Sequence, residues 1–287
     1  WNLPLYLLTW KIAPALAAGN TVVAKPSEIT PMTAFLLSKI SQKANLPKGV
    51  LNIVHGYGHK AGDALSRHPD VPIISFTGGT ATGEKIASVA APMFKKLSLE
   101  LGGKNPNIVF EDAEFDKSVD MAVKAAFSNQ GQICLSGSRL FVQESIYKKF
   151  RDTFTSKTKE LKVGNPKEDD SNLGAIVSKA HMKKVLSCIE LAKSEGGEIL
   201  TGGKRIILEG ELSEGYYIKP TIIDGLNYTC RTNQEEIFGP VVSMIPFSTE
   251  KEVIDMANST KYGLSASIFT KDVSRAHRIA SAIDSGI

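Results

Sequence analysis

Short β-branched runs alternate with helix-like segments along the chain, and this alternation limits the possible folds most strongly. The strand-like runs are residues 21–24, 50–54, 73–76, 97–101, 107–110, 139–143, 241–247 and 265–270. The helix-like segments, with apolar residues three or four positions apart, are 31–44, 58–67, 84–91, 115–127, 146–161, 178–194, 249–258 and 273–283. Because short joints and intervening helices are typical of parallel strands, the sequence predicts an α/β fold whose parallel sheet is covered on both faces.

Composition and charge exclude several functional classes. The 287 residues are 42% hydrophobic and 22% charged, which is typical of globular domains. The net charge of +4 comes from scattered lysines, so we expect neither a nucleic-acid partner nor a membrane-binding patch. No apolar run approaches the roughly 20 residues that a membrane span requires.

A glycine pair indicates where the chain divides. The apolar run 97–101 ends at Gly102 and Gly103, so we expect one domain over residues 1–101 and a second over 102–287. The chain starts on WNLPL without an initiator Met and stops on DSGI, directly after a predicted helix. We therefore expect an internal fragment in which both domains are truncated and any targeting signal lies outside.

Three cysteines occur, and only one has an unusual setting. Their wide spacing fits a reducing compartment, so the sequence predicts a cytoplasmic protein. Cys188 lies on the apolar face of a predicted helix and Cys230 in a predicted loop, and we interpret both as inert. Cys134 follows a helix and stands between Gly131 and Gly137 in NQGQICLSGSR, which favours an accessible nucleophilic thiolate over a buried structural thiol.

The carboxylate of Glu100 is the best candidate for a base that works with this thiol. It lies in the otherwise apolar LSLELGG segment, where it either faces water on an edge strand or is half-buried and able to take a proton from water. None of the five histidines lies in a context typical of a cysteine-protease partner, and His181 and His277 are predicted to be surface residues of charged helices. The others are His55, His59 and His68.

Two glycine-bearing turns are candidates for phosphate binding. FTGGTATGEKI places Gly78 and Gly83 between a strand and a helix, whose open N–H groups favour a phosphate. Glu84 replaces the Lys of a P-loop, which disfavours Mg-nucleotide hydrolysis. HGYGHKAG contains Gly58, but Gly62 comes one position later than the dinucleotide fingerprint requires. The HGYGHKAG signal is weak by itself, and an ordinary turn between strand and helix explains FTGGTATGEKI about equally well.

Charged residues in two further segments have both a binding and an ordinary interpretation. Lys25 and Glu28 follow a strand in VVAKPSE, where a carboxylate can accept bonds from ribose hydroxyls and repel a 2′-phosphate, which favours NAD over NADP. The alternative, in which Lys25 and Glu28 are two solvated charges in a turn, explains the segment equally well. In EEIFGPV (235–241) solvated glutamates are the simpler interpretation, and a Gly-Pro turn that holds Phe238 against a ligand is the alternative.

Six motifs, taken in order, resemble the aldehyde dehydrogenase superfamily from Trp1 to Ile287. They are WNLPL, PALAAGNTVVAKPSE, FTGGTATG, LELGGKNP, NQGQICLSGSR and EEIFGP. The resemblance implies a Rossmann-type cofactor domain and an α/β catalytic domain, without about the first third and the last stretch of the family's chain. One departure is Gly79, where many members carry Ser, so that a hydroxyl contact to phosphate is lost.

The resemblance also assigns roles. Cys134 would be the nucleophile, Glu100 the general base, and Asn2 an oxyanion donor together with the backbone N–H of Cys134. Lys25 and Glu28 would hold the adenosine ribose, residues 78–83 would flank the pyrophosphate, Glu236 would bind the nicotinamide ribose, and Phe238 would pack against the cofactor. The implied NAD-binding set is Trp1, Lys25, Glu28, Gly58, Gly78, Gly79, Gly83, Glu236 and Phe238.

The implied activity is NAD-dependent oxidation of a small-molecule aldehyde to a carboxylic acid, through a thiohemiacetal and a thioester on Cys134. No metal is implied, and the full-length protein would be a homodimer or homotetramer. A CoA-acylating enzyme is disfavoured because Glu100 is retained, and a crystallin-like non-catalytic scaffold because both Cys134 and Glu100 are retained. A thiol hydrolase that uses no nucleotide is disfavoured, because the FTGGTATG segment would then have no function. For the substrate, retinal or general aliphatic aldehydes stay an alternative.

Overall fold

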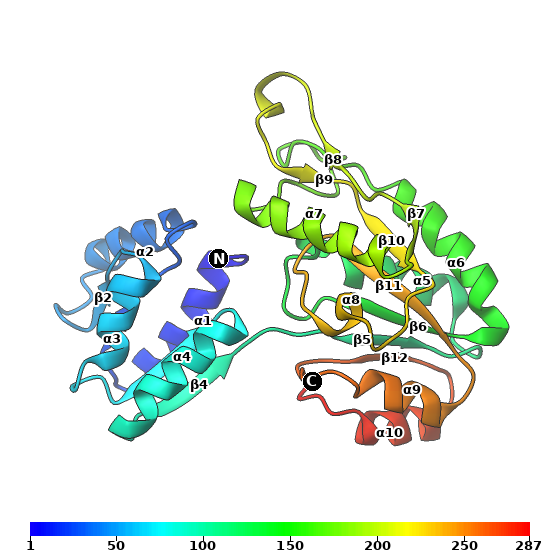
Figure 1. The fold of residues 1–287 in the computed structure, drawn as a ribbon. Coiled ribbons are helices and arrows are strands. Elements are labelled where there is room, and N and C mark those ends of the chain that lie inside the picture. The colour runs from blue at the N-terminus through cyan, green and yellow to red at the C-terminus, as the bar shows by residue number, and fades with distance from the viewer. The chain divides into compact units, whose positions relative to one another are not determined.

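The computed structural model describes all 287 residues and divides into two compact units, Trp1–Leu101 and Gly102–Ile287 (Figure 1). The roles that the sequence assigns to the two domains stay predictions. No helix in either unit has the length and apolar character needed to cross a bilayer.

The first unit contains two small parallel sheets and the helices that connect their strands. Its elements are α1 (Pro4–Ala17), β1 (Val22–Ala24), α2 (Met32–Lys43), β2 (Leu51–Ile53), η1 (Gly58–Gly62), α3 (Asp63–Arg67), β3 (Ile73–Thr77), α4 (Thr80–Ala90), η2 (Ala91–Met93) and β4 (Lys96–Glu100). Strand β1 pairs with β2, and β3 pairs with β4, in both cases in parallel. Helices thus cross between parallel partners, as the alternating pattern predicts.

Two elements of this unit differ in kind from the sequence prediction. The first is α1, which lies over residues for which no helix was predicted. Pro4 lies at the first helical position, where its missing N–H removes no intrahelical bond, so the helix forms. The second is the predicted helix 58–67, which begins as the π-helical η1 and becomes α-helical only at Asp63.

The second unit is built on a six-stranded sheet with the order β12-β5-β6-β11-β10-β7. Its elements are β5 (Pro106–Val109), α5 (Phe115–Phe127), η3 (Ser128–Gly131), β6 (Arg139–Gln143), α6 (Glu144–Lys159), α7 (Lys179–Ser194), β7 (Glu198–Thr201), β8 (Arg205–Ile206), η4 (Gly210–Leu212), β9 (Tyr217–Ile218), β10 (Thr221–Asp224), α8 (Arg231–Gln234), β11 (Val241–Phe247), α9 (Glu250–Ala257), β12 (Ser267–Phe269) and α10 (Val273–Ala282). Strands β12, β5, β6, β11 and β10 are parallel, whereas the edge strand β7 is antiparallel to β10. Four of the five parallel strands, β5, β6, β11 and β12, were predicted, at residues 107–110, 139–143, 241–247 and 265–270. Strand β10 and the antiparallel edge strand β7 were not predicted.

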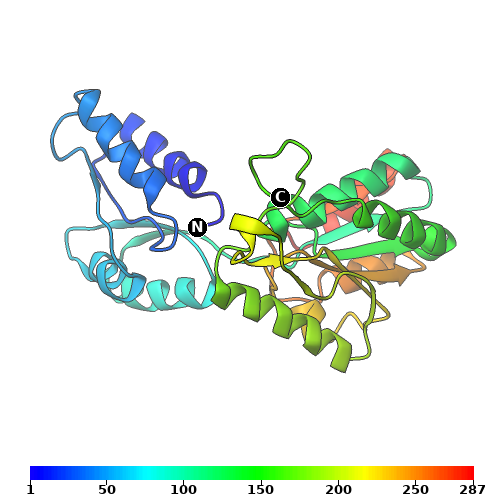
Figure 2. The same ribbon diagram turned by 90° about the horizontal axis from the view of Figure 1, so that it is seen from above.

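Both faces of this sheet are buried, which explains why its strands are continuously apolar. Leu140 and Val142 point into the cluster formed with α5 and α6, while Phe141 between them packs with α9 and α10. Likewise Ile222 of β10 faces the α5–α6 layer, and Ile223 faces α7. Helices α6 and α7 accordingly lie on opposite sides of the sheet (Figure 2).

A buried arginine joins the start of the sheet to the end of α9. Arg139 is only 1% exposed, and its guanidinium donates to the carbonyls of Lys104 (2.8 Å), Met256 (2.9 Å) and Ala257 (2.7 Å). The last two carbonyls belong to the C-terminal turn of α9, where the helix dipole favours a cation. Burial lowers the pKa of Arg139 to about 10, so the group stays charged at neutral pH.

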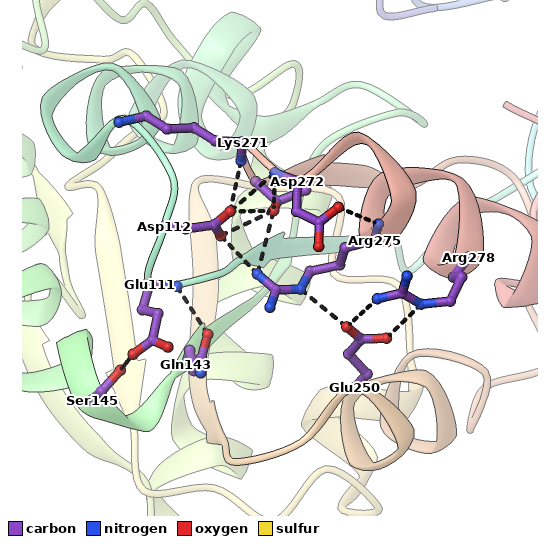
Figure 3. A network of polar contacts seen from close by, with 10 residues as sticks. Glu111, Asp112, Gln143, Ser145, Glu250, Lys271, Asp272, Arg275 and Arg278 are labelled. Carbon is purple, nitrogen blue, oxygen red and sulfur yellow. Dashed lines mark hydrogen bonds and ion pairs between the residues drawn. The ribbon is translucent and has the colours of Figure 1, made fainter.

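An ion-pair network secures the opposite ends of the same strands (Figure 3). Asp112, which follows β5, accepts from Thr270, from the backbone N–H groups of residues 271 and 272, and from Arg275 at 2.9 Å. Arg275 and Arg278 of α10 both donate to Glu250 at the start of α9. The network attaches α9 and α10 to the ends of β5 and β12.

We predict that Arg139→Met lowers the free energy of unfolding by about 3–5 kcal/mol, because three buried carbonyls lose a charged donor. Urea unfolding measures the loss. The exposed Arg278→Ala variant is the control and should cost at most about 1 kcal/mol. Equal losses in the two variants would contradict the role assigned to Arg139.

Candidate functional site

Cys134 lies in a tight turn whose carbonyls are held by a buried amide. The bond from Ser136 N–H to the carbonyl of Ile133 closes the turn at 3.1 Å. Nδ2 of Asn105 donates to the carbonyl of Cys134 (2.7 Å) and to that of Ser136 (2.9 Å), and its Oδ1 accepts from the Ser265 N–H (3.1 Å). Asn105 is 3% exposed and Cys134 is half-buried. The amide therefore fixes the thiol's backbone to the start of β5.

A run of three left-handed residues leads into this turn. Asn129, Gln130 and Gly131 have φ values of 50°, 57° and 63°, and such φ values are uncommon outside glycine. A Cβ on Gly131 would overlap the carbonyl of Gly239, so only glycine fits there. The side-chain Oε1 of Gln132 accepts from the Val177 N–H at 3.1 Å. The NQGQ segment thus connects the Cys134 turn to the EEIFGP segment and to the chain before α7.

Glu236 and the Cys134 turn meet the same glycine pair. Oε1 of Glu236 accepts from the Gly103 N–H at 2.9 Å, and a Cβ on Gly102 would lie 2.5 Å from its Oε2. A Cβ on Gly103 would lie 2.6 Å from the carbonyl oxygen of Cys134. Burial raises the pKa of Glu236, while the Gly103 N–H opposes that shift. The structure therefore brings two of the predicted site residues together across Gly102 and Gly103.

The predicted surface position of His181 is wrong. Its ring is half-buried, its Nε2 lies 2.7 Å from the carbonyl oxygen of Phe238, and the two rings meet edge to face. Phe238 itself has a left-handed φ of 60°. Burial lowers the pKa of His181. His277, by contrast, is exposed as predicted.

Lys104 is a buried charge that sequence reasoning missed. It directly follows the glycine pair and is 2% exposed. Burial, together with the neighbouring Arg139, lowers the pKa of Lys104 to about 7, and Glu236 acts in the opposite direction. A lysine at the start of a buried strand was the available signal, because such a residue cannot easily reach water.

The first unit has a cavity beside the predicted ribose-binding charges. Nζ of Lys25 donates to the carbonyls of Pro26 (2.7 Å) and Gly56 (3.2 Å) and lies 3.6 Å from the Glu28 carboxylate. Backbone N–H bonding and Lys25 lower the pKa of Glu28. The cavity has a volume of about 470 Å³, a size typical of small-molecule sites. Its lining includes Pro26, Glu28, Phe35, His55 and Tyr57.

The glycine turn of the first unit leads directly into a helix N-terminus. Gly79 is extended and caps α4, which begins at Thr80 rather than at the predicted Glu84. No atom lies within 4 Å of a Cβ built on Gly79 or on Gly58. A serine would therefore fit at position 79 without a clash, and the N-terminal N–H groups of α4 suit a phosphate.

The remaining predicted residues also lie in the first unit. Glu100 ends β4 and is half-buried, and its backbone carbonyl accepts from the Gly78 N–H at 3.0 Å. Trp1 and Asn2 precede α1 and are half-buried. Because Glu100 and Asn2 belong to one unit and Cys134 to the other, their meeting at a single site stays a prediction.

The chain is similar to known proteins along its whole length. The sequence model of the aldehyde dehydrogenase family matches residues 1–287, so the chain belongs to this family. It is 52% identical to the 2-aminomuconic semialdehyde dehydrogenase of Mus musculus and 48% identical to the peroxisomal aminoaldehyde dehydrogenase 1 of Pisum sativum, over 100% of this chain and 59% and 56% of those proteins. The chain thus spans less than three fifths of the length of these relatives.

The fold of the chain is also similar to solved structures of aldehyde dehydrogenases. Betaine aldehyde dehydrogenase from Staphylococcus aureus, solved in complex with NAD+, superposes with a TM-score of 0.97 at 43% identity, covering 100% of this chain and 57% of that one. The α/β fold and the family that the six motifs indicate are confirmed.

We predict that stability rises with pH above the folded-state pKa of Lys104. The group titrates near 10.5 when exposed and at about 7 in the fold, so the unfolded chain holds the extra proton in this window. Urea midpoints compared at about pH 7 and about pH 9.5 should show a gain that Lys104→Met removes. The exposed Lys183→Met variant should retain the gain. If both variants behave alike, the buried charge of Lys104 is not its source.

Proposed function

We propose that the full-length protein oxidises an aldehyde to its carboxylic acid with NAD as the hydride acceptor. The observation that carries the proposal is the close approach at Gly102 and Gly103, which places the turn of Cys134 beside the carboxylate of Glu236. A thiol that attacks a carbonyl and a carboxylate that binds the nicotinamide ribose would need to be neighbours for hydride transfer.

The chain's residues fit such a dinucleotide. Glu28 lines a cavity of about 470 Å³ that would take the adenosine, and Lys25 donates to the carbonyls of Pro26 and Gly56 in its wall. The N-terminus of α4, with Gly78, Gly79 and Gly83, would take the pyrophosphate. Glu236 would bind the nicotinamide ribose. Phe238, Trp1 and Gly58 complete the proposed set. When bound, NAD would accept the hydride that the aldehyde carbon releases.

Each proposed step uses a residue suited to it. The Cys134 sulfur forms a bond to the carbonyl carbon, and the resulting oxyanion is stabilised by the amide of Asn2 and the backbone N–H of Cys134. Removal of one such donor costs about 10²–10³ in rate in other enzymes. Once the hydride has left, the former aldehyde carbon is the carbonyl carbon of a thioester with Cys134. Glu100 then takes a proton from water, the hydroxide adds, and the acid leaves as the Cys134 thiolate is restored.

For the substrate, we propose a semialdehyde such as 2-aminomuconic semialdehyde. This proposal is supported by sequence identities of 52% and 50% to the 2-aminomuconic semialdehyde dehydrogenases of Mus musculus and Homo sapiens. Oxidation of retinal or of general aliphatic aldehydes is the second candidate. Assembly into a homodimer or homotetramer and a cytoplasmic location stay predictions.

We predict that Glu100→Gln in the full-length protein gives one burst of NADH and then stalls at the thioester, because the variant lacks the base that activates water. Rapid-mixing absorbance of NADH with an aldehyde panel measures the burst. Cys134→Ala is the control and should give neither burst nor turnover. A loss of burst and steady state together in Glu100→Gln would point to another base.

We also predict that Glu28→Ala narrows the preference for NAD over NADP, because the carboxylate would repel a 2′-phosphate. The ratio of kcat/KM for the two cofactors measures this preference. The exposed Asp70→Ala variant in the same unit removes a negative charge outside the cavity and should leave the ratio unchanged. An unchanged ratio in Glu28→Ala would rule out its role in cofactor selection.

A further inference from the structure

A buried amide forms three hydrogen bonds directly behind the candidate nucleophile. Nδ2 of Asn105 donates to the carbonyl of Cys134 at 2.7 Å and to that of Ser136 at 2.9 Å. Its Oδ1 accepts from the backbone N–H of Ser265 at 3.1 Å. An amide nitrogen carries two protons, so both donors are used on the Cys134 turn. In the flipped orientation the amide oxygen would face two carbonyls, so these contacts determine which way the amide points.

The amide approaches the Cys134 turn from the interior of the second unit. Asn105 is 3% exposed, whereas Leu135, in the middle of the turn, is 45% exposed and Cys134 is half-buried. A Cβ on Gly103 would lie 2.7 Å from Oδ1 of Asn105, so the amide also fills the space beside this glycine. The donors of Asn105 therefore hold the turn from behind and leave its outer side to a substrate.

The backbone that carries this amide is itself fixed to the sheet. Asn105 directly precedes β5, which pairs with β6 on one side and with β12 on the other. The carbonyl of Asn105 accepts from the Arg139 N–H at 3.2 Å, at the start of β6. Ser265, which orients the amide, is 9% exposed and precedes β12. A side chain held by strands in this way is positioned more precisely than one on a loop.

The donation to Cys134 selects the orientation of one peptide group in the turn. Residues 133–136 form a β-turn closed by the bond from the Ser136 N–H to the Ile133 carbonyl at 3.1 Å. That bond leaves the middle peptide, which carries the Cys134 carbonyl, able to rotate, because the two common turn types share it and differ by about 150° in ψ of the second residue. Asn105 binds this carbonyl and fixes the rotation. A complete flip requires a positive φ at Leu135, so loss of the amide should loosen the peptide group rather than invert it.

We propose that Asn105 is a positioning residue for the Cys134 thiol. The loosened ψ belongs to the Cα that bears the sulfur, so a fixed peptide group holds the sulfur in one direction. A sulfur held in this way reaches the attacking geometry more often than one on a loosened turn. Asn105 acts through the two carbonyls and touches neither aldehyde nor cofactor. The inference rests on the proposed function, since it takes Cys134 as the nucleophile.

The test uses the full-length protein and all three of its cysteines. Asn105→Leu removes the three bonds at a similar side-chain size and adds no charge. It should lower the rate constants of the NADH burst and of Cys134 alkylation by iodoacetamide about tenfold, and change the Kd for NAD and the alkylation of Cys188 and Cys230 by less than about twofold. Peptide mass spectrometry follows each thiol separately. Asn105→Ser restores one donor and should recover part of both rates.

Asn258 provides a matched control, because its amide makes similar bonds away from Cys134. Its Nδ2 donates to the carbonyl of Ala282 at 2.8 Å, and its Oδ1 accepts from the Asp284 N–H at 2.9 Å. Asn258→Leu should lower the thermal unfolding midpoint, as Asn105→Leu does, and should retain the wild-type burst and alkylation rates. The pair separates a loss of stability from a loss of positioning.

The outcomes also separate this inference from the proposed function. Wild-type protein that binds NAD but yields no NADH with any aldehyde would overturn the proposed function, and this inference with it. A normal burst in wild type, with wild-type burst and alkylation rates in Asn105→Leu, would overturn the positioning role alone. So would an equal loss of both rates in Asn258→Leu. If Asn105→Leu does not fold, Asn105→Ser decides, and rates equal to those of wild type would overturn the role.

Discussion

The close approach of two loops to the backbone of Gly102 and Gly103 is the constraint on which the candidate site depends. A side chain at either position would collide with the Glu236 carboxylate or with the carbonyl of Cys134, at 2.5 Å and 2.6 Å. The Gly103 N–H then gives the carboxylate a fixed partner. The Cys134 turn and the Glu236 carboxylate, which are far apart in the chain, therefore both lie against the same glycine pair. A reaction that needs the thiol and the carboxylate side by side can be proposed on this basis.

Around this point the backbone is held by side-chain donors that bind carbonyls. Asn105 holds the Cys134 turn, Arg139 joins the start of the sheet to α9, and His181 and Lys184 hold the segment that carries Glu236. A side chain that donates to a loop's carbonyls fixes the loop's backbone from one side. It adds no group on the side of the loop that it does not contact. Because Asn105 and Arg139 are buried, the bonds they make have little competition from water, and losing one leaves a carbonyl unpaired.

Much of the fold was predictable because the local signals were strong. Helix 115–127 and strands 139–143 and 241–247 have the predicted bounds, since each combines a clear period with apolar residues that the sheet buries. Helix α1, which begins at Pro4, was not predicted, although proline is common in the first turn of a helix. Strands β7 and β10 were not predicted, and their antiparallel pairing joins segments that are separate in the chain. His181 was misplaced because its neighbours in sequence are charged, while its partner Phe238 is 57 positions away.

The sequence by itself determined the residue types and the local conformations they require: a cysteine among glycines, a carboxylate ending an apolar strand, and a glycine turn before a helix. These are properties of a few adjacent residues, so they can be recognised without coordinates. Only the tertiary structure decided which of these segments meet. The contacts of Glu236 with Gly103, of Asn105 with the Cys134 turn and of α7 with Phe238 join residues far apart in the chain. Such contacts follow from the packing of whole helices and strands, which no short stretch of sequence specifies.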